Sequence, residues 1–156
     1  MPEKISPDCV IDILRLFDEK LSVLNQHSAY RTNKAVRSKE IIFALYQKYP
    51  SQEVLAAYRK LIEKGYLELR KETVILPNGK LGASRVPELN KFKSHHVIAL
   101  THLGREFLEQ SKNPHAWEKI KSLLSTAADI STLAEYAANH GKLFGQISSA
   151  ILSFFL

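Results

Sequence analysis

The chain has 156 residues, of which 45% are hydrophobic and 24% charged, and this composition excludes fibrous and intrinsically disordered proteins. Its 22 Lys and Arg residues against 16 Asp and Glu give a net charge of +6, which favours a polyanionic partner. The single cysteine, Cys9, excludes an intrachain disulfide framework and a cysteine-rich zinc module. We expect a cytoplasmic protein, because the N-terminus lacks the apolar core of a signal peptide and no apolar run reaches about 18 residues.

The positive charge is concentrated in the middle of the chain. Residues 27–96 hold 14 Lys and Arg against 6 Asp and Glu, a net charge of +8, whereas residues 1–26 and 122–156 are slightly negative. A basic segment of this kind is typical of a surface that contacts nucleic acid, although a solvated lysine-rich face explains the same bias.

Three helices are predicted in the first half of the chain. Ser6 and Pro7 form a helix start, and apolar residues then recur at three- and four-residue steps as far as Leu24. Residues 25–37 show no period and are expected to form a loop. We expect Ser38 to cap a helix over residues 39–49 and Ser51 to cap another over residues 52–64, which Gly65 then ends in the left-handed conformation.

The spacing of apolar residues in 52–64 predicts which side of this helix is buried. The residues expected inward are Val54, Leu55, Tyr58, Leu61 and Ile62. The residues expected outward are Gln52, Glu53, Ala56, Ala57, Arg59, Lys60 and Glu63.

The period of the pattern changes after Gly65. Alternation and β-branched residues predict one strand across residues 66–76, followed by a turn at 77–80, a long basic loop over 80–95 and a second strand at 96–100. Thr101 is expected to cap a helix over residues 102–110, and Pro114 to begin another that buries Trp117. A further helix is predicted over residues 131–139.

This order of elements is that of a winged helix-turn-helix. The predicted fold class is therefore α+β, mostly α, with a long wing hairpin and a C-terminal helical region. We expect a winged helix-turn-helix domain over residues 1–112 and a helical oligomerisation region over residues 113–156.

Two stretches also resemble known proteins. The run Val97-Ile98-Ala99-Leu100-Thr101-x-x-Gly104-Arg105-x-Phe107-Leu108 looks like the exit from the wing in many bacterial winged-helix proteins. Its continuation, Pro114-x-x-Trp117-Glu118-Lys119-Ile120-Lys121, is similar to a family of small uncharacterised winged-helix proteins of phages and prophages. The resemblance covers about residues 38–140 and implies a fold rather than an activity.

The predicted function is DNA binding without catalysis, in a dimeric transcriptional regulator of phage or mobile-element origin. A helix fits the major groove, where its outward side chains reach base edges, and lysines on a wing contact the backbone. The residues predicted to bind double-stranded DNA are Ser51, Gln52, Arg59, Lys60 and Lys64 on the helix, and Lys80, Arg85, Lys91 and Lys93 on the wing.

The nearly uncharged C-terminal segment predicts association with a second copy of the chain. It is too short to span a bilayer, and its polar side carries serine and glutamine, so a membrane is not the expected partner. The residues predicted to mediate oligomerisation, most simply as a two-fold dimer, are Trp117, Leu143, Phe144, Ile147, Ile151, Phe154 and Phe155.

No catalytic residues, metal site or cofactor are expected. His95, His96 and His102 have no Asp, Glu or Cys at ligand spacing, and no nucleophile-base pair or phosphate loop stands out. Two other interpretations stay open: a protein-interaction adaptor of a phage-encoded or phage-defence complex that binds proteins through its wing and C-terminal helix, and a small membrane-active toxin.

Overall fold

The computed structural model describes residues 5–26, 35–85, 95–126, 151, 154 and 155 of the chain. They form a mixed α+β structure, mostly helical, with a small antiparallel sheet. The chain divides into two compact units, Met1–Leu100 and Thr101–Leu156. The division therefore falls before the helix that follows Thr101, whereas the sequence placed it after that helix, at residue 112.

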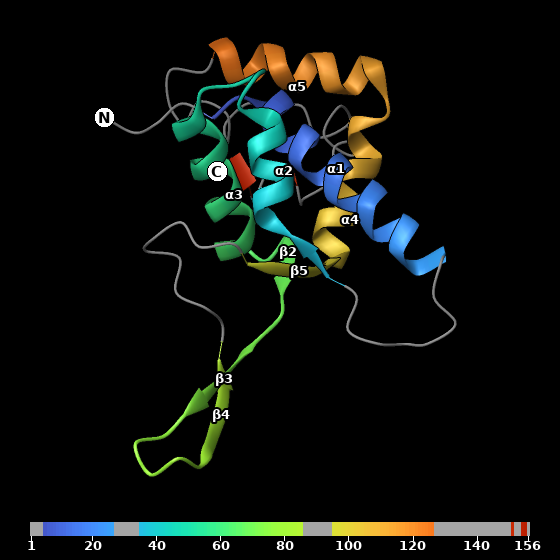
Figure 1. Ribbon diagram of the computed structural model, residues 1–156. Helices are drawn as coiled ribbons and strands as arrows, with labels where there is room; N and C mark the ends of the chain where they lie inside the picture. Colours follow the sequence, from blue (N-terminus) through green and yellow to red (C-terminus); the bar gives the residue numbers. More distant parts are fainter. Residues whose placement is uncertain (1–4, 27–34, 86–94, 127–150, 152–153, 156) are drawn as a thin grey trace. The chain divides into compact units, whose positions relative to one another are not determined.

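The described residues of the first unit form three helices and five strands, most of which are labelled in Figure 1. The helices are α1 (Pro7–Gln26), α2 (Ser38–Leu45) and α3 (Ser51–Glu63), and the strands are β1 (Val36–Arg37), β2 (Leu67–Leu69), β3 (Glu72–Ile75), β4 (Leu81–Arg85) and β5 (His96–Leu100). A three-stranded antiparallel sheet has the order β1-β5-β2, and β3 pairs with β4 in a separate hairpin.

The core of this unit lies where α1 packs against α2, α3 and β5. Its centre is apolar and aromatic. The ring centroids of Phe17 on α1 and Tyr58 on α3 lie 6.3 Å apart, and both side chains are buried. Burial of such side chains stabilises the fold by about 1.5–3 kcal/mol each. The same helices therefore hold α3 in a fixed orientation on the sheet.

Two local signals in this unit are confirmed. The Ser6 hydroxyl accepts a 3.3 Å hydrogen bond from the N–H of Cys9, and α1 begins at Pro7. Gly65 follows α3 with φ = 81°, a conformation that glycine adopts without a steric penalty. Both signals depend only on neighbouring residues, which is why the sequence alone identifies them.

The predicted caps at Ser38 and Ser51 are wrong. Each serine is the first residue of its helix, and the preceding positions, Arg37 and Pro50, make no side-chain capping bond. Ser38 is instead fully buried, and its hydroxyl accepts a 2.8 Å hydrogen bond from the N–H of His95. A partner 57 residues away thus takes the hydroxyl that the local pattern assigned to the helix end.

The single strand predicted over residues 66–76 is interrupted at Arg70 and Lys71. Before the break β2 pairs with β5, and the N–H of Arg70 still donates to the carbonyl of His96 at 2.8 Å. After the break β3 turns to pair with β4, a strand within the predicted loop, because its register partners lie across the turn that contains Gly79 at φ = 79°. The alternating pattern of the sequence continues across Arg70 and Lys71, so the pattern alone does not show that the strand changes its pairing partner there.

Two boundaries also differ from the predicted ones. The helix expected over residues 39–49 ends at Leu45, and the N–H groups of Lys48 and Tyr49 donate to the Leu45 carbonyl in the turn that follows. The expected loop over residues 25–37 contains the end of α1 and the short strand β1, which pairs with β5.

The second unit contains α4 (His102–Ser111), α5 (Pro114–Thr126) and helical residues near the C-terminus. The predicted Thr101 cap is confirmed, since its hydroxyl accepts a 3.2 Å bond from the N–H of Gly104, and α5 begins at Pro114 as expected. Phe107 lies at the centre of an aromatic cluster, with its ring centroid 6.1 Å from Trp117, 5.7 Å from Phe154 and 6.1 Å from Phe155. The helix predicted over residues 131–139 lies outside the described residues.

Candidate nucleic-acid interface

The side of α3 that faces outward in the structure differs in part from the side that the sequence predicted. Ala57, expected to face outward, is fully buried, whereas Leu55 and Ile62, expected inward, are only half-buried. Ala57 therefore belongs to the side of α3 that faces the core, although its small side chain gives only a weak apolar signal in the sequence. Ser51, Gln52 and Lys64 are exposed, and Arg59 and Lys60 are half-buried.

Four of the five predicted recognition-helix residues border one surface cavity of about 500 Å³. They are Gln52, Arg59, Lys60 and Lys64, and the other lining residues are Ile5, Leu55, Ala56 and Glu63. Burial, together with the nearby charge of Lys64, lowers the pKa of Lys60 below its ordinary value. The lining of the cavity thus combines three basic residues and one acid with apolar side chains.

Glu53 does not stand on this face as a free acid. Its carboxylate accepts a 2.9 Å hydrogen bond from the N–H of Ser6, and the contact joins the start of α1 to the first turn of α3. Of the two acids that the sequence placed outward on this helix, only Glu63 is exposed. Glu53 is thus bound to the start of α1, whereas Glu63 is one of the residues that line the cavity.

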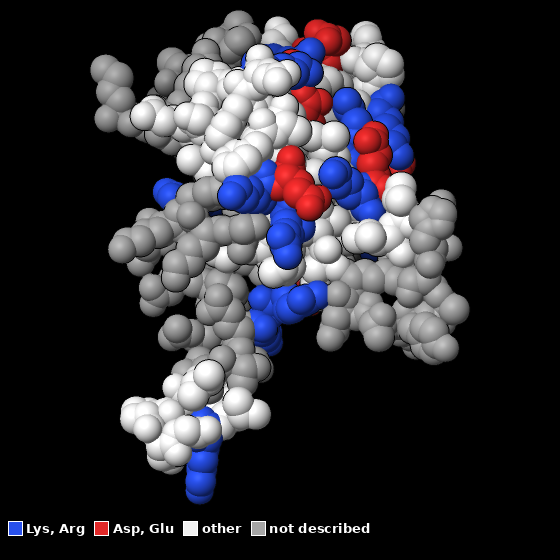
Figure 2. All heavy atoms as spheres, in the orientation of Figure 1, with Lys and Arg blue, Asp and Glu red and all other residues white. Residues whose placement is uncertain are grey.

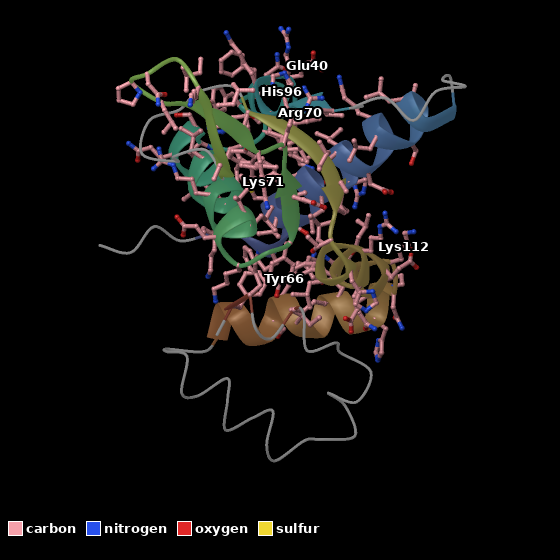
Figure 3. All side chains as sticks on the ribbon, turned by 90° about the horizontal axis from the view of Figure 1, so that it is seen from below. Glu40, Tyr66, Arg70, Lys71, His96 and Lys112 are labelled. Carbon is pink, nitrogen blue, oxygen red and sulfur yellow. The ribbon has the colours of Figure 1, made fainter. Side chains whose placement is uncertain are left out.

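A second group of basic residues lies at the end of the three-stranded sheet where the hairpin begins. We call Arg37, Arg70, Lys71 and His96 the sheet-end cluster. Arg37 is the register partner of His96, and the backbone of Arg70 donates to that of His96. Figure 3 shows Arg70 and His96 next to one another, with Glu40 beside them. Glu40 forms a 3.5 Å ion pair with Lys20.

The sequence did not predict the sheet-end cluster. Its members come from three segments that only strand pairing brings together, namely β1, the residues after β2, and β5. The signal that was present is the pair Arg70-Lys71 directly after a short alternating run. When the pairing of the strands is not known, Arg70 and Lys71 look like ordinary exposed residues of a strand.

The β3–β4 hairpin carries the predicted wing residues that the structure describes. Lys80 is exposed in the turn, and Arg85 is the last residue of β4. Lys91 and Lys93 lie outside the described residues. Figure 2 shows basic and acidic side chains interspersed on the body of the face in view, and no acidic one at the described tip of the hairpin. Residues 73–87 contain no Asp or Glu, and Glu72, the first residue of β3, is the register partner of Arg85 at the base of the hairpin.

Two polar networks hold the helices that carry these surfaces. Asp12 of α1 accepts hydrogen bonds from the Lys48 ammonium at 2.7 Å and the Tyr49 hydroxyl at 2.6 Å. The second network joins Ser38, His95 and Tyr58, whose hydroxyl lies 3.5 Å from Nδ1 of His95. Burial raises the pKa of Tyr58 to about 12, against the opposing effect of its hydrogen bond with Ser38.

Neither histidine of the 95–96 pair belongs to a metal-ligand cluster in the part of the chain that the structure describes, where no three His, Cys, Asp or Glu residues group together. His95 is buried and His96 half-buried, as expected for neighbours that face opposite sides of a strand. No helix among the described residues is long and apolar enough to cross a membrane.

Four of the seven residues predicted to mediate oligomerisation lie among the described residues. Trp117, Ile151 and Phe154 are buried, and Phe155 is half-buried. Leu143, Phe144 and Ile147 lie outside the described residues. The buried rings pack around Phe107, so the first role of these side chains is to build the second unit.

Comparisons with known proteins found no relative of this chain. No protein-family model, curated protein or solved structure matches the chain.

Proposed function

We propose that this chain is a non-enzymatic winged-helix protein that binds double-stranded DNA, with α3 in the major groove and the β3–β4 hairpin as its wing. The observation that carries the proposal is the sheet-end cluster, since it sets basic residues at the base of a hairpin that has no acid beyond Glu72, its first residue. The resemblance to phage and prophage proteins extends the proposal to a transcriptional regulator of mobile-element origin.

The order of the elements supports the winged-helix assignment. A helix and a short strand precede two helices joined by a short turn, and two antiparallel strands follow with an extended hairpin between them. The sheet order β1-β5-β2 places the last strand in the middle, so that both connections to the hairpin leave from the same end of the sheet. A protein built in this way presents a helix and a hairpin to one ligand.

The charges support DNA as that ligand. On α3, Gln52 and Arg59 have the chemistry to read base edges, while Lys64 suits a phosphate. Lys60 contributes less under this proposal, because its lowered pKa reflects partial burial. The sheet-end cluster, Lys80 and the other wing cations supply the contacts to the backbone that do not depend on sequence.

The decisive experiment is the salt dependence of binding to a random-sequence duplex by the full chain. Neutralising several phosphates predicts that affinity falls steeply as salt rises, and an absence of binding at about 50 mM salt contradicts the proposal. A genome-wide pulldown with the native protein then identifies the sequences bound.

Variants separate the two modes of contact. The double variant Arg37→Ala/Arg70→Ala should weaken binding to all sequences equally and flatten the salt slope by about one unit for each phosphate that the protein no longer neutralises. Arg59→Ala should relax sequence preference instead, at a cost of about 1–3 kcal/mol on the preferred site. Lys112→Ala removes one exposed cation at the C-cap position of α4 in the second unit, the same change in charge as Arg59→Ala, and should alter neither the salt slope nor the sequence preference.

We further propose that the regulator acts as a dimer. Two α3 helices related by a two-fold axis would read half-sites about one helical turn apart. Light scattering gives the molar mass of the full chain, and a monomer at the concentrations where DNA binds would contradict this step.

One observation favours the adaptor as a second candidate. A groove of about 610 Å³ lies among the end of α1, β1 and the start of α2. Val23 and Leu24 in its lining are 54% and 38% exposed, and Glu19, Lys20 and Glu40 border it. Exposed apolar side chains next to charged ones are typical of protein contacts, and Arg37 and His96 of the sheet-end cluster also line this groove. Glu19→Ala leaves DNA binding unchanged under both hypotheses, whereas Val23→Ser should abolish capture of a protein partner only if the adaptor hypothesis holds.

A further inference from the structure

The two most exposed large apolar side chains among the described residues face one another across the β3–β4 hairpin. Ile75 is 74% exposed and Leu81 is 76% exposed, and they are direct register partners. Direct partners in an antiparallel pair lie on the same face with their Cβ atoms about 5 Å apart. Leu76, 40% exposed, follows on the other face.

The turn beyond this pair is fixed by hydrogen bonds. The N–H of Leu76 donates to the Lys80 carbonyl at 2.9 Å, and the N–H of Gly79 donates to the Leu76 carbonyl at 2.9 Å. The Asn78 side chain accepts a 3.0 Å bond from the N–H of Lys80. The hairpin therefore ends in a defined tip that holds Ile75 and Leu81 outward, although neither contributes to a core.

The charge around the hairpin tip indicates what kind of molecule the tip binds. Residues 73–87 contain Lys80 and Arg85 and no acid, and the hairpin rises from the cations of the sheet-end cluster. A hairpin whose apolar tip carries Lys80, and whose one acid, Glu72, lies at the base opposite Arg85, complements a polyanion with an apolar interior. Stacked bases behind a phosphate backbone have this combination, and apolar side chains are known to insert between base steps from the minor groove.

We propose that Ile75 and Leu81 form a wedge that enters the minor groove of duplex DNA and bends it. This inference deepens the DNA-binding function proposed above and rests on it. The minor groove is about 6 Å wide, whereas two paired strands alone lie about 4.8 Å apart before their side chains are counted. Entry of the tip therefore requires the groove to widen, and an apolar wedge widens it by partly unstacking a base step.

The test measures binding and bending on the same probe. A 30-base-pair duplex of mixed sequence, with a donor and an acceptor dye on its ends, reports affinity by anisotropy and bending by energy transfer. The wild-type chain should raise energy transfer as it binds, corresponding to a bend of at least about 20°. The variant Ile75→Ser/Leu81→Ser should lose that rise and bind at least about tenfold more weakly, with an unchanged salt slope.

Two controls distinguish the wedge from other roles of the hairpin. Lys80→Ala should lower the salt slope by about one unit and keep the bend, because it removes a phosphate contact only. Leu103→Ser, at another exposed leucine, should change neither quantity. An unchanged circular dichroism spectrum and urea midpoint in Ile75→Ser/Leu81→Ser show that the fold is intact, as expected for side chains outside the core.

Several results would overturn the wedge. Wild-type binding without bending, or bending that survives Ile75→Ser/Leu81→Ser, contradicts it and leaves the DNA-binding function standing. A fall in molar mass in that variant shows that a second copy of the chain covers the apolar pair instead. If the wild-type chain fails to bind the duplex at all, the DNA-binding function fails first and the wedge with it.

Discussion

The hydroxyl of Ser38 and the backbone N–H of His95 are joined by a 2.8 Å hydrogen bond in the interior of the first unit. The return bond runs from the N–H of Ser38 to the His95 carbonyl, also at 2.8 Å. Together they fasten the first residue of α2 to the residue before β5 and so set the end of the sheet from which the hairpin leaves.

Ser38→Ala should destabilise the protein by about 1–3 kcal/mol, because it leaves the buried N–H of His95 without its acceptor. The free energy of unfolding in urea measures the loss. Ser51→Ala is the matched control: Ser51 also begins a helix but is exposed and makes no capping bond, so its effect should stay within about 0.5 kcal/mol. Equal effects in the two variants would contradict the role given to Ser38.

Asp12→Asn should destabilise the protein at pH 7 by about 1.5–3 kcal/mol, the range for hydrogen bonds to a charged group. Burial acts to raise the pKa of Asp12, but the hydrogen bonds from Lys48 and Tyr49 outweigh it and hold the pKa below its ordinary 3.8. The ionised carboxylate therefore stabilises the fold above that pH, and the contribution is lost as pH falls through the folded-state pKa.

Unfolding curves at pH 7 and pH 3 test this dependence. The difference between wild type and Asp12→Asn should shrink at the lower pH, where the wild-type carboxyl is becoming protonated. Glu19→Gln, an exposed acid on the same helix, should show no such convergence.

Cys9 should resist thiol reagents in the native protein. Its side chain is fully buried, and burial, with the nearby charges of Glu53 and Asp12, raises the pKa of the thiol to about 12. The thiolate is the reactive form, so labelling should wait for unfolding. A disulfide reagent at pH 8 should react within seconds in denaturant and at the unfolding rate in buffer; rapid labelling in buffer would contradict the burial of this helix face.

Phe154→Ala should destabilise the second unit by about 3–5 kcal/mol, since it removes a buried ring that packs edge-on against Phe107. Phe155→Ala should cost less, because that side chain is only half-buried. Unfolding monitored by Trp117 fluorescence reports on the same cluster. A larger effect at Phe155 than at Phe154 would contradict the packing.

This packing also changes how oligomerisation must be tested. A chain that ends at residue 141 lacks Phe154 and Phe155 and so loses part of the aromatic cluster together with any dimer interface. The half-exposed Phe155 offers a milder change. Phe155→Ser should lower the molar mass measured by light scattering if the C-terminal segment joins two copies, and stability measured on the same sample separates that effect from unfolding.

The sequence predicted those parts of the fold that neighbouring residues determine. Ser6, Gly65 and Thr101 act through atoms within a few positions along the chain, and all three behave as predicted. Ser38 carries the same local signal as Thr101, but a partner distant in sequence takes its hydroxyl. Local patterns cannot separate these two cases.

The same distinction applies to the candidate site, where local patterns predict some of the residues and miss others. The helix that carries Gln52, Arg59, Lys60 and Lys64 could be predicted from apolar spacing, although the burial of Ala57 and the partial exposure of Leu55 and Ile62 could not. The sheet-end cluster could not be predicted, since Arg37 and Arg70 meet only through β5. Whether these residues contact DNA stays a prediction that the salt-dependence experiment decides.

The break at Arg70 and Lys71 has a consequence for how such a protein can diversify. The ladder between β2 and β5 closes before the hairpin begins, so residues 72–85 hydrogen-bond in their own two-stranded sheet. Insertions, deletions or wholesale replacement of that arm would leave the interior of the first unit untouched. Binding preference could then evolve, or be engineered, by exchanging one peripheral module at little cost to folding.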